Sequence, residues 1–76
     1  MTARLPRVTA AEAIRALERA GFSLVRQSGS HKIYKSPQGR RATVPFHAGK
    51  ILHPKALQAI LKDAELSVER FQELIR

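Results

Sequence analysis

Three histidines, His31, His47 and His53, are the side chains in this sequence best suited to move protons near neutral pH. As zinc ligands they are poorly spaced, because separations of 16 and 6 residues without any cysteine do not match the usual zinc-site patterns. One histidine is enough for metal-free cleavage of RNA, since RNA supplies its own nucleophile, the 2′-hydroxyl. Acid–base chemistry on an RNA phosphodiester, with no metal or other cofactor, is therefore one reaction that a single histidine of this chain could carry out.

His31 is the strongest candidate because it follows a short turn, Ser28-Gly29-Ser30, and directly precedes Lys32. In this position we expect the imidazole to lie at a sheet edge, with the turn amides and Lys32 facing a phosphate. The alternative for His31 is a polar strand residue that is hydrogen-bonded to the turn. We expect His47 to be a loop residue and His53 to lie at the start of a helix.

Positive charge is concentrated in one part of the chain. The 14 Lys and Arg outnumber the 6 Asp and Glu, which gives a formal net charge of +8. Residues 19–62 contain all three histidines but no acidic residue. This stretch should attract polyanions such as nucleic acids, and it lacks the carboxylates of a two-metal nuclease site or a carboxylate acid–base pair. A solvated basic surface that keeps a small protein soluble is the alternative.

The candidate phosphate contacts are in the turn, on the strand after it, in a later loop and on one helix ridge. Lys55 and Lys62 would share that exposed ridge, where a solvated face with no ligand is the alternative. The full set is Ser28, Gly29, Ser30, Lys32, Lys35, Lys50, Lys55 and Lys62.

Hydrophobic spacing and turn residues predict the elements that must position these side chains. A capping box at Thr9 and Glu12 opens an amphipathic helix over about residues 10–20. A second helix begins at Pro54, and Ser67 caps a short C-terminal helix. The predicted strands cover residues 22–27, 31–35 and 41–45. This order predicts an α+β fold of two layers, in which helices cover one face of a three-stranded antiparallel sheet.

Length and composition predict a single domain over residues 1–76. The four aromatic residues, Phe22, Tyr34, Phe46 and Phe71, are expected in its core. The absence of cysteine argues against a disulfide-stabilised secreted protein. Residues 1–8 lack the apolar stretch of a signal peptide, and no window of the sequence approaches a membrane span. We therefore expect a cytoplasmic protein without a membrane partner.

Two short motifs occur together: Gly29-Ser30-His31 before a strand, and Pro-x-His-x-Gly-Lys over residues 45–50. With Leu5-Pro6-Arg7, Ala20-Gly21-Phe22 and residues 57–71, they extend over nearly the whole chain. On these residues the sequence resembles the HicA toxins of bacterial and archaeal HicA/HicB toxin–antitoxin systems. It departs from the common pattern at Lys55-Ala56, where a Gly-Thr pair is usual.

The resemblance implies a double-stranded-RNA-binding-domain-like fold, α-β-β-β-α, and a type II toxin that arrests growth as a ribosome-independent mRNA interferase. It also implies a HicB-like antitoxin as partner, and His31 of Gly-Ser-His as the catalytic histidine. We therefore expect a metal-independent endoribonuclease that is monomeric when free. The alternatives are a basic RNA-binding module without catalysis and a protein-interaction domain whose basic face binds an acidic partner.

Overall fold

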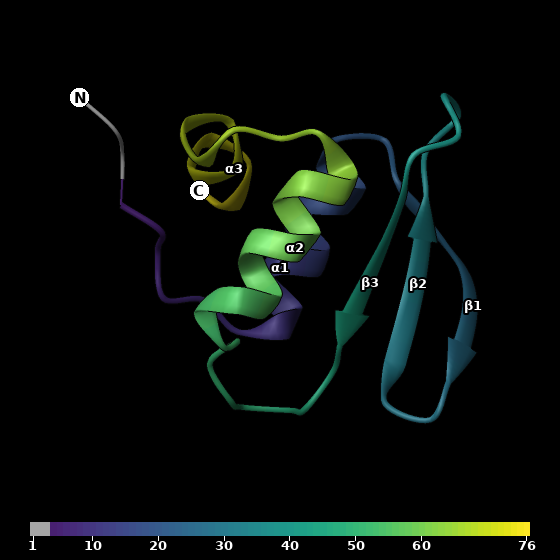
Figure 1. The fold of residues 1–76 in the computed structure, drawn as a ribbon, viewed down its shortest axis with the longest axis horizontal. Helices are drawn as coiled ribbons and strands as arrows, with labels where there is room; N and C mark the ends of the chain where they lie inside the picture. The colour runs from purple at the N-terminus through teal and green to yellow at the C-terminus, as the bar shows by residue number, and fades with distance from the viewer. Residues whose placement is uncertain (1–3) are drawn as a thin grey trace.

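The computed structural model describes residues 4–76, which form three helices and three strands in the predicted order (Figure 1). The elements are α1 (Ala10–Arg19), β1 (Ser23–Ser28), β2 (His31–Lys35), β3 (Arg41–Pro45), α2 (Pro54–Ala64) and α3 (Val68–Ile75). Strands β2 and β3 have the predicted bounds. Helix α1 ends one residue earlier, and β1 lies one residue later, than the sequence predicts.

The first backbone amides of a helix have no acceptor within the helix, and side chains at the helix starts supply acceptors for them. The predicted capping box of α1 is confirmed: the Thr9 amide donates to Glu12 Oε1 at 2.9 Å, and the Glu12 amide donates to Thr9 Oγ1 at 3.2 Å. Ser67 Oγ accepts from the Arg70 amide at 3.0 Å and caps α3. The helices have 10, 11 and 8 residues, and none among residues 4–76 combines the length and hydropathy that a membrane crossing requires.

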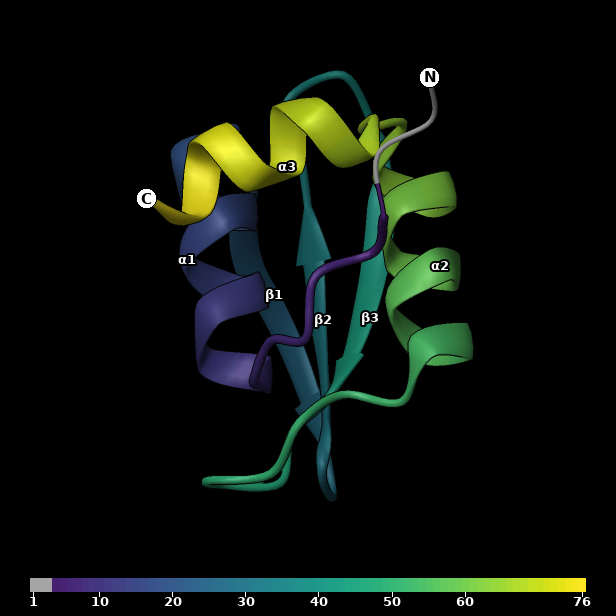
Figure 2. The ribbon, with the colours of Figure 1, turned by 90° about the vertical axis from the view of Figure 1, so that its left-hand side faces the viewer.

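The sheet is an antiparallel meander in the order β1-β2-β3, so β2 is its central strand. Tyr34, Ala42 and Val44 are buried on one face, and Figure 2 shows α1 and α2 side by side over that face. The opposite face is open. The Ser36–Gly39 turn forms as predicted, with the Gly39 amide donating to the Ser36 carbonyl at 3.0 Å. The predicted α+β, double-stranded-RNA-binding-domain-like architecture is confirmed.

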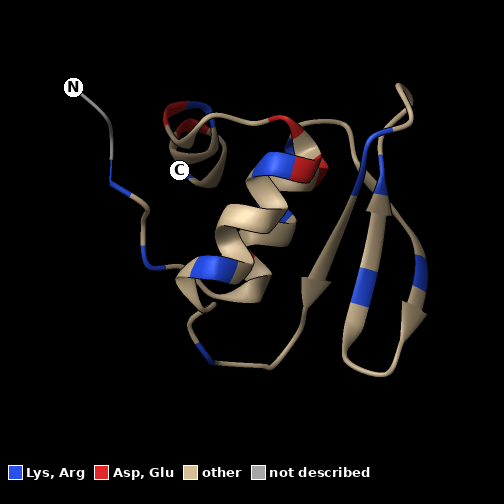
Figure 3. Ribbon diagram, viewed as in Figure 1, with Lys and Arg blue, Asp and Glu red and all other residues tan. Residues whose placement is uncertain are grey.

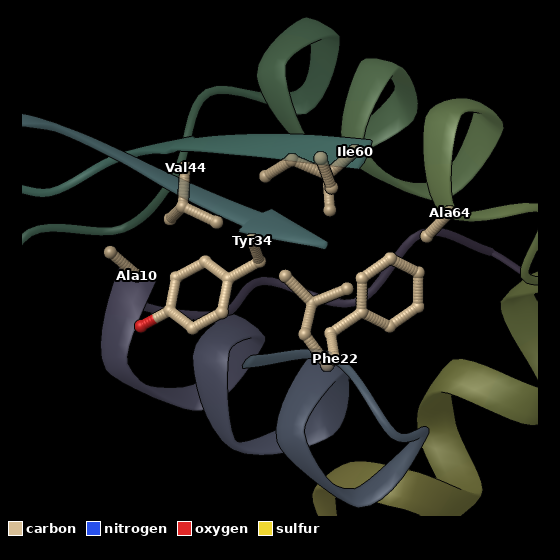
Figure 4. Close-up of a cluster of buried hydrophobic side chains, with 8 residues drawn as sticks. Ala10, Phe22, Tyr34, Val44, Ile60 and Ala64 are labelled. Atoms are coloured by element: carbon tan, nitrogen blue, oxygen red, sulfur yellow. The ribbon is translucent and has the colours of Figure 1, made fainter. Parts of the chain in front are cut away.

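Two clusters of buried side chains hold the layers together. The first fills the space between the sheet and the helix pair, where the Tyr34 ring lies against α1 beside Ala10 (Figure 4). The second lies on the other side of the helix pair and joins α1 and α2 to α3 and to Val8. Helix α3 and the N-terminal segment therefore form a partial third layer, which the two-layer prediction lacks. Phe22, Tyr34 and Phe71 are buried as predicted, whereas Phe46 is partly buried.

Candidate functional site

The turn that precedes His31 is a two-residue hairpin connection. Strand β1 ends at Ser28, β2 begins at His31, and the two residues pair directly. Gly29 has φ of +57°, and a glycine with positive φ at the first turn position is typical of type II′ hairpins. The Gln27 side-chain amide donates to the Gly29 carbonyl at 3.2 Å and closes the turn. This geometry fixes where β2 starts and therefore where His31 lies.

His31 lies on the open face of the sheet, at the end of the central strand. The sequence predicts a sheet edge for this residue, and that prediction is wrong, because β1 and β3 flank β2 on both sides. The side chain is exposed and makes no hydrogen bond or ion pair with any residue in the range 4–76. The alternative of a histidine hydrogen-bonded to the turn is therefore not observed.

The strand register gathers basic side chains on the same open face. Arg26 pairs with Ile33, and Lys35 pairs with Arg41, so all four point to the side where His31 lies. Arg26 is a diagonal neighbour of His31, about 7–8 Å away for such a pair. Lys35 and Arg41 lie at the other end of the face, about 13 Å further along the strand. We call Arg26, His31, Lys35 and Arg41 the basic face.

Acidic side chains lie elsewhere. Figure 3 shows blue Lys and Arg positions on the strands, whereas the red positions visible in this view lie at the end of α2 and on α3. Among residues 4–76 the ion pairs are Arg40 with Glu65 at 3.1 Å and Arg70 with Glu73 at 3.2 Å. Neither pair involves the basic face. Its cations are therefore available to an anionic ligand.

Arg26 and Arg41 are absent from the contacts predicted from the sequence, and Arg26 reaches the open face through an irregularity. The register shifts between Leu24 and Arg26, so Val25 is an extra, bulged residue. Simple alternation would place Arg26 on the same face as Leu24, the helix-covered face. The position of Arg41 could have been predicted from the sequence. The Ser36–Gly39 turn joins β2 to β3 so that Arg41 pairs with Lys35 and lies on the same face.

Lys32 points to the opposite side of the sheet from His31. It pairs with Val44, which is fully buried on the helix-covered face. Lys32 is half-buried, and its Nζ lies 4.1 Å from the centroid of the Phe46 ring. The cation therefore interacts with the aromatic face of the residue that follows β3. The structure does not bring the ammonium group and the imidazole together.

The remaining predicted lysines belong to other parts of the surface. Lys50 is exposed in the loop over residues 46–52, Lys55 is exposed in the first turn of α2, and Lys62 is exposed in the last turn of that helix. Ser30, which precedes His31, connects to this loop through its carbonyl, which accepts from the Phe46 amide at 2.6 Å. The loop that carries Lys50 is therefore hydrogen-bonded to the turn before His31. Lys62 lies away from both, at the C-terminal end of α2.

His47 and His53 occupy the positions predicted for them. His47 is an exposed loop residue. His53 is the N-cap of α2, and its Nδ1 accepts from the Lys55 amide at 3.1 Å. The helix starts regularly with Pro54 in its first turn, although Lys55-Ala56 replaces the usual Gly-Thr. No group of three His, Cys, Asp or Glu side chains among the described residues is arranged to hold a metal ion.

Tyr34 is a titratable residue of the core, and its side chain lies on the opposite side of the sheet from the basic face. Burial raises the pKa of Tyr34 above the ordinary value of 10.0, and the nearby negative charge of Glu18 raises it further. The neutral phenol is therefore the form that the folded protein favours. Tyr34 supports the sheet from inside and is not available to a ligand.

Comparison with known protein families agrees with the fold and with the motifs. A family described as HicA toxin of bacterial toxin-antitoxin matches residues 10–66, about three quarters of the chain. The matched segment runs from the start of α1 past the end of α2, so it contains the hairpin turn, His31 and the whole basic face. No curated protein matches the chain.

Proposed function

Since the chain belongs to the HicA toxins of bacterial toxin–antitoxin systems, we propose that it is a metal-independent endoribonuclease that cleaves mRNA with His31 as its catalytic residue. The observation that carries the proposal is an exposed imidazole with no hydrogen-bond or ion-pair partner among residues 4–76, on a face whose charged side chains are all basic. An imidazole beside cations is suited to proton transfer at a phosphodiester.

In the proposed reaction, His31 accepts the proton of the 2′-hydroxyl as that oxygen attacks the adjacent phosphorus. A bond forms between O2′ and phosphorus, and the bond from phosphorus to O5′ breaks. The leaving O5′ takes a proton from the imidazolium or from water. The products are a 2′,3′-cyclic phosphate and a 5′-hydroxyl end, and the negative charge that develops on the phosphoryl oxygens needs nearby cations.

Arg26 is the cation best placed to stabilise that charge, because it is the diagonal neighbour of His31 on the same face. A guanidinium group can donate two parallel hydrogen bonds to a phosphate. We assign Lys35 and Arg41 to phosphates further along the RNA, together with the backbone of Ser28-Gly29-Ser30 near the reacting group. Lys32, Lys50, Lys55 and Lys62 remain predicted contacts outside this face.

The test compares His31→Ala with Gln38→Ala, which changes an exposed polar residue in the other hairpin turn. Purified proteins are incubated with RNA in excess EDTA, and each variant is also induced in cells to measure growth arrest. We expect cleavage and toxicity from wild type and Gln38→Ala, and neither from a folded His31→Ala protein. RNA with a 2′-deoxynucleotide at the cleaved step should resist cleavage.

A fully active His31→Ala variant would refute the assignment. Tight RNA binding by the wild type without any cleavage would instead support a non-catalytic RNA-binding module. We propose that a cytoplasmic HicB-like antitoxin neutralises the toxin by covering the basic face with acidic side chains. A structure of that complex in which His31 stays accessible would contradict this mode of inhibition.

A further inference from the structure

A pocket opens where β3 ends, between the loop over residues 46–52 and the first turn of α2. Its volume is ≈ 290 Å³, near the lower limit of about 300 Å³ for small-ligand sites. This size suits one planar group rather than a folded segment of nucleic acid. The pocket is lined by Pro45, His47, Lys50, Ile51, Leu52, His53 and Ala56.

The pocket begins directly beside the candidate catalytic residue. Pro45 lines it and is also the cross-strand partner of His31 on β2. The Cα atoms of such a pair lie about 5 Å apart, and their side chains share one face. The hydrogen bond between the Phe46 amide and the Ser30 carbonyl, at 2.6 Å, fixes the next residue of the loop to the turn. Pro45 is therefore the residue that connects the strand pair carrying His31 to the pocket.

The walls of the pocket are mainly apolar. Ile51 is 47% exposed, although isoleucine is among the residues most often fully buried in folded proteins. Pro45 and Ala56 are half-buried. An exposed isoleucine at the rim of a pocket provides a surface on which a flat ring can pack.

Polar groups at the pocket can recognise the edge of such a ring. Nδ1 of His53 accepts a hydrogen bond from the Lys55 amide at 3.1 Å, so the proton of the neutral imidazole lies on Nε2, which is left to donate. Lys50 adds a cation at the same pocket. Donors of this kind suit the carbonyl oxygens and ring nitrogens of nucleobases.

We propose that this pocket binds the base of one RNA nucleotide next to the phosphodiester that is cleaved at His31. The proposal rests on the proposed function, and it adds a base-binding subsite to a face that otherwise contacts phosphate. Phosphate contacts alone carry no sequence information. With a base bound in the pocket, the rate of cleavage depends on which base occupies that position. His47, Lys50 and His53 are the residues that would set the preference.

The binding test uses the four ribonucleoside 3′-monophosphates as probes, with inorganic phosphate as the reference, and follows the wild-type protein by NMR. We expect the nucleotides to shift resonances of Ile51 and Ala56, with affinities that differ among the four bases. Inorganic phosphate should leave these two residues unshifted. Equal shifts from phosphate alone would overturn the proposal, because they would reveal an anion site without base recognition.

The variant test compares Ile51→Ser with Val25→Ser, since Val25 is 52% exposed on the edge strand and lies outside the pocket. We expect Ile51→Ser to weaken nucleotide binding about fivefold or more, as loss of a packing surface for a base does, and to flatten the base preference of cleavage. Val25→Ser should match the wild type. Ala56→Leu, which fills the pocket with a residue that favours helix, should have the same effect as Ile51→Ser.

The two proposals fail in different ways. If the wild type cleaves RNA, but nucleotides leave Ile51 unshifted and Ile51→Ser keeps the wild-type preference, the pocket proposal alone is overturned. If nucleotides shift Ile51 and Ala56 but the wild type cleaves no RNA, the link between pocket and cleavage is overturned together with the proposed function.

Discussion

The ammonium nitrogen of Lys32 lies 4.1 Å from the centroid of the Phe46 ring, on the side of the sheet that His31 does not face. This contact ties the second residue of β2 to the residue where the chain leaves β3. Phe46 is also the residue whose amide binds the Ser30 carbonyl. Lys32 therefore helps to position the end of the sheet that carries His31.

We expect Lys32→Met and Phe46→Leu each to destabilise the protein, with a coupling of about 0.5–1 kcal/mol in a double-mutant cycle. The physical reason is that a half-buried cation over an aromatic ring loses its partner in either variant. Urea unfolding of the two single variants and the double variant measures the coupling. Additive losses would show that the two side chains do not interact.

Arg26→Gln should lower RNA cleavage by about 10²–10³-fold, the range seen when a donor to a developing negative charge is removed. Arg26→Lys should recover only part of the loss, because an ammonium group does not donate two parallel hydrogen bonds. Single-turnover cleavage separates this loss from weaker binding. Arg15→Gln, an exposed change on α1, is the matched control. Equal rates for Arg26→Gln and Arg15→Gln would remove Arg26 from the proposed mechanism.

Arg41→Gln should weaken RNA binding similarly for all sequences and make it less sensitive to salt. Loss of one phosphate contact on a single strand reduces the slope of log K against log salt by about 0.7. Titrations of a non-cleaved 2′-deoxy oligonucleotide over a range of salt concentrations give the slope. An unchanged slope would mean that RNA does not reach the far end of the basic face.

Gly29→Ala should destabilise the hairpin by about 1–2 kcal/mol, because φ of +57° is unfavourable for a residue with a Cβ. Crowding is not the cause, since an added Cβ would meet no atom within 4 Å. Gly29→Asn should cost less, as asparagine tolerates positive φ better than alanine does. Chemical denaturation of the two variants provides the comparison. Equal losses for both would indicate a cause other than the backbone angle.

Stability should fall at high pH through Tyr34. The pKa of Tyr34 is raised in the folded state above 10.0, so folding favours the neutral phenol. This contribution is fully present below about pH 10 and is lost as the pH rises through the folded-state pKa. Tyr34→Phe should show a weaker decline in unfolding free energy above pH 10. If the unfolding free energies of the wild type and Tyr34→Phe decline in parallel above pH 10, groups other than Tyr34 cause the loss of stability at high pH.

Local sequence signals were sufficient for most of the fold. The Thr9–Glu12 capping box and the Ser36–Gly39 turn act within three or four residues, and both form as predicted. Gly29 likewise adopts the positive φ that its turn requires. Such short-range chemistry can be interpreted without knowledge of the tertiary structure.

The composition of the basic face could be predicted only in part. His31 and Lys35 were identified from the sequence, but Arg26 was not. The alternation of side chains in β1 is interrupted at the bulge, and no residue type in the sequence indicates the extra residue. To predict the side to which Lys32 points, one must know which face of the sheet is buried. The tertiary packing of Tyr34 and Val44 determines that face. Side-chain alternation defines two faces, but long-range contacts determine which of them the helices cover.

The bulge at Val25 has a consequence for insertions and deletions. Losing one residue from a strand usually moves every later side chain to the other face of the sheet. Strand β1 has one residue more than its pairing with β2 uses, since Leu24 pairs with Tyr34 and Arg26 with Ile33. Deletion of Val25 would straighten the strand and keep Arg26 and Ser28 opposite their present partners. At this register shift, the one found in the described strands, the chain can lose a residue while the same side chains remain on the basic face.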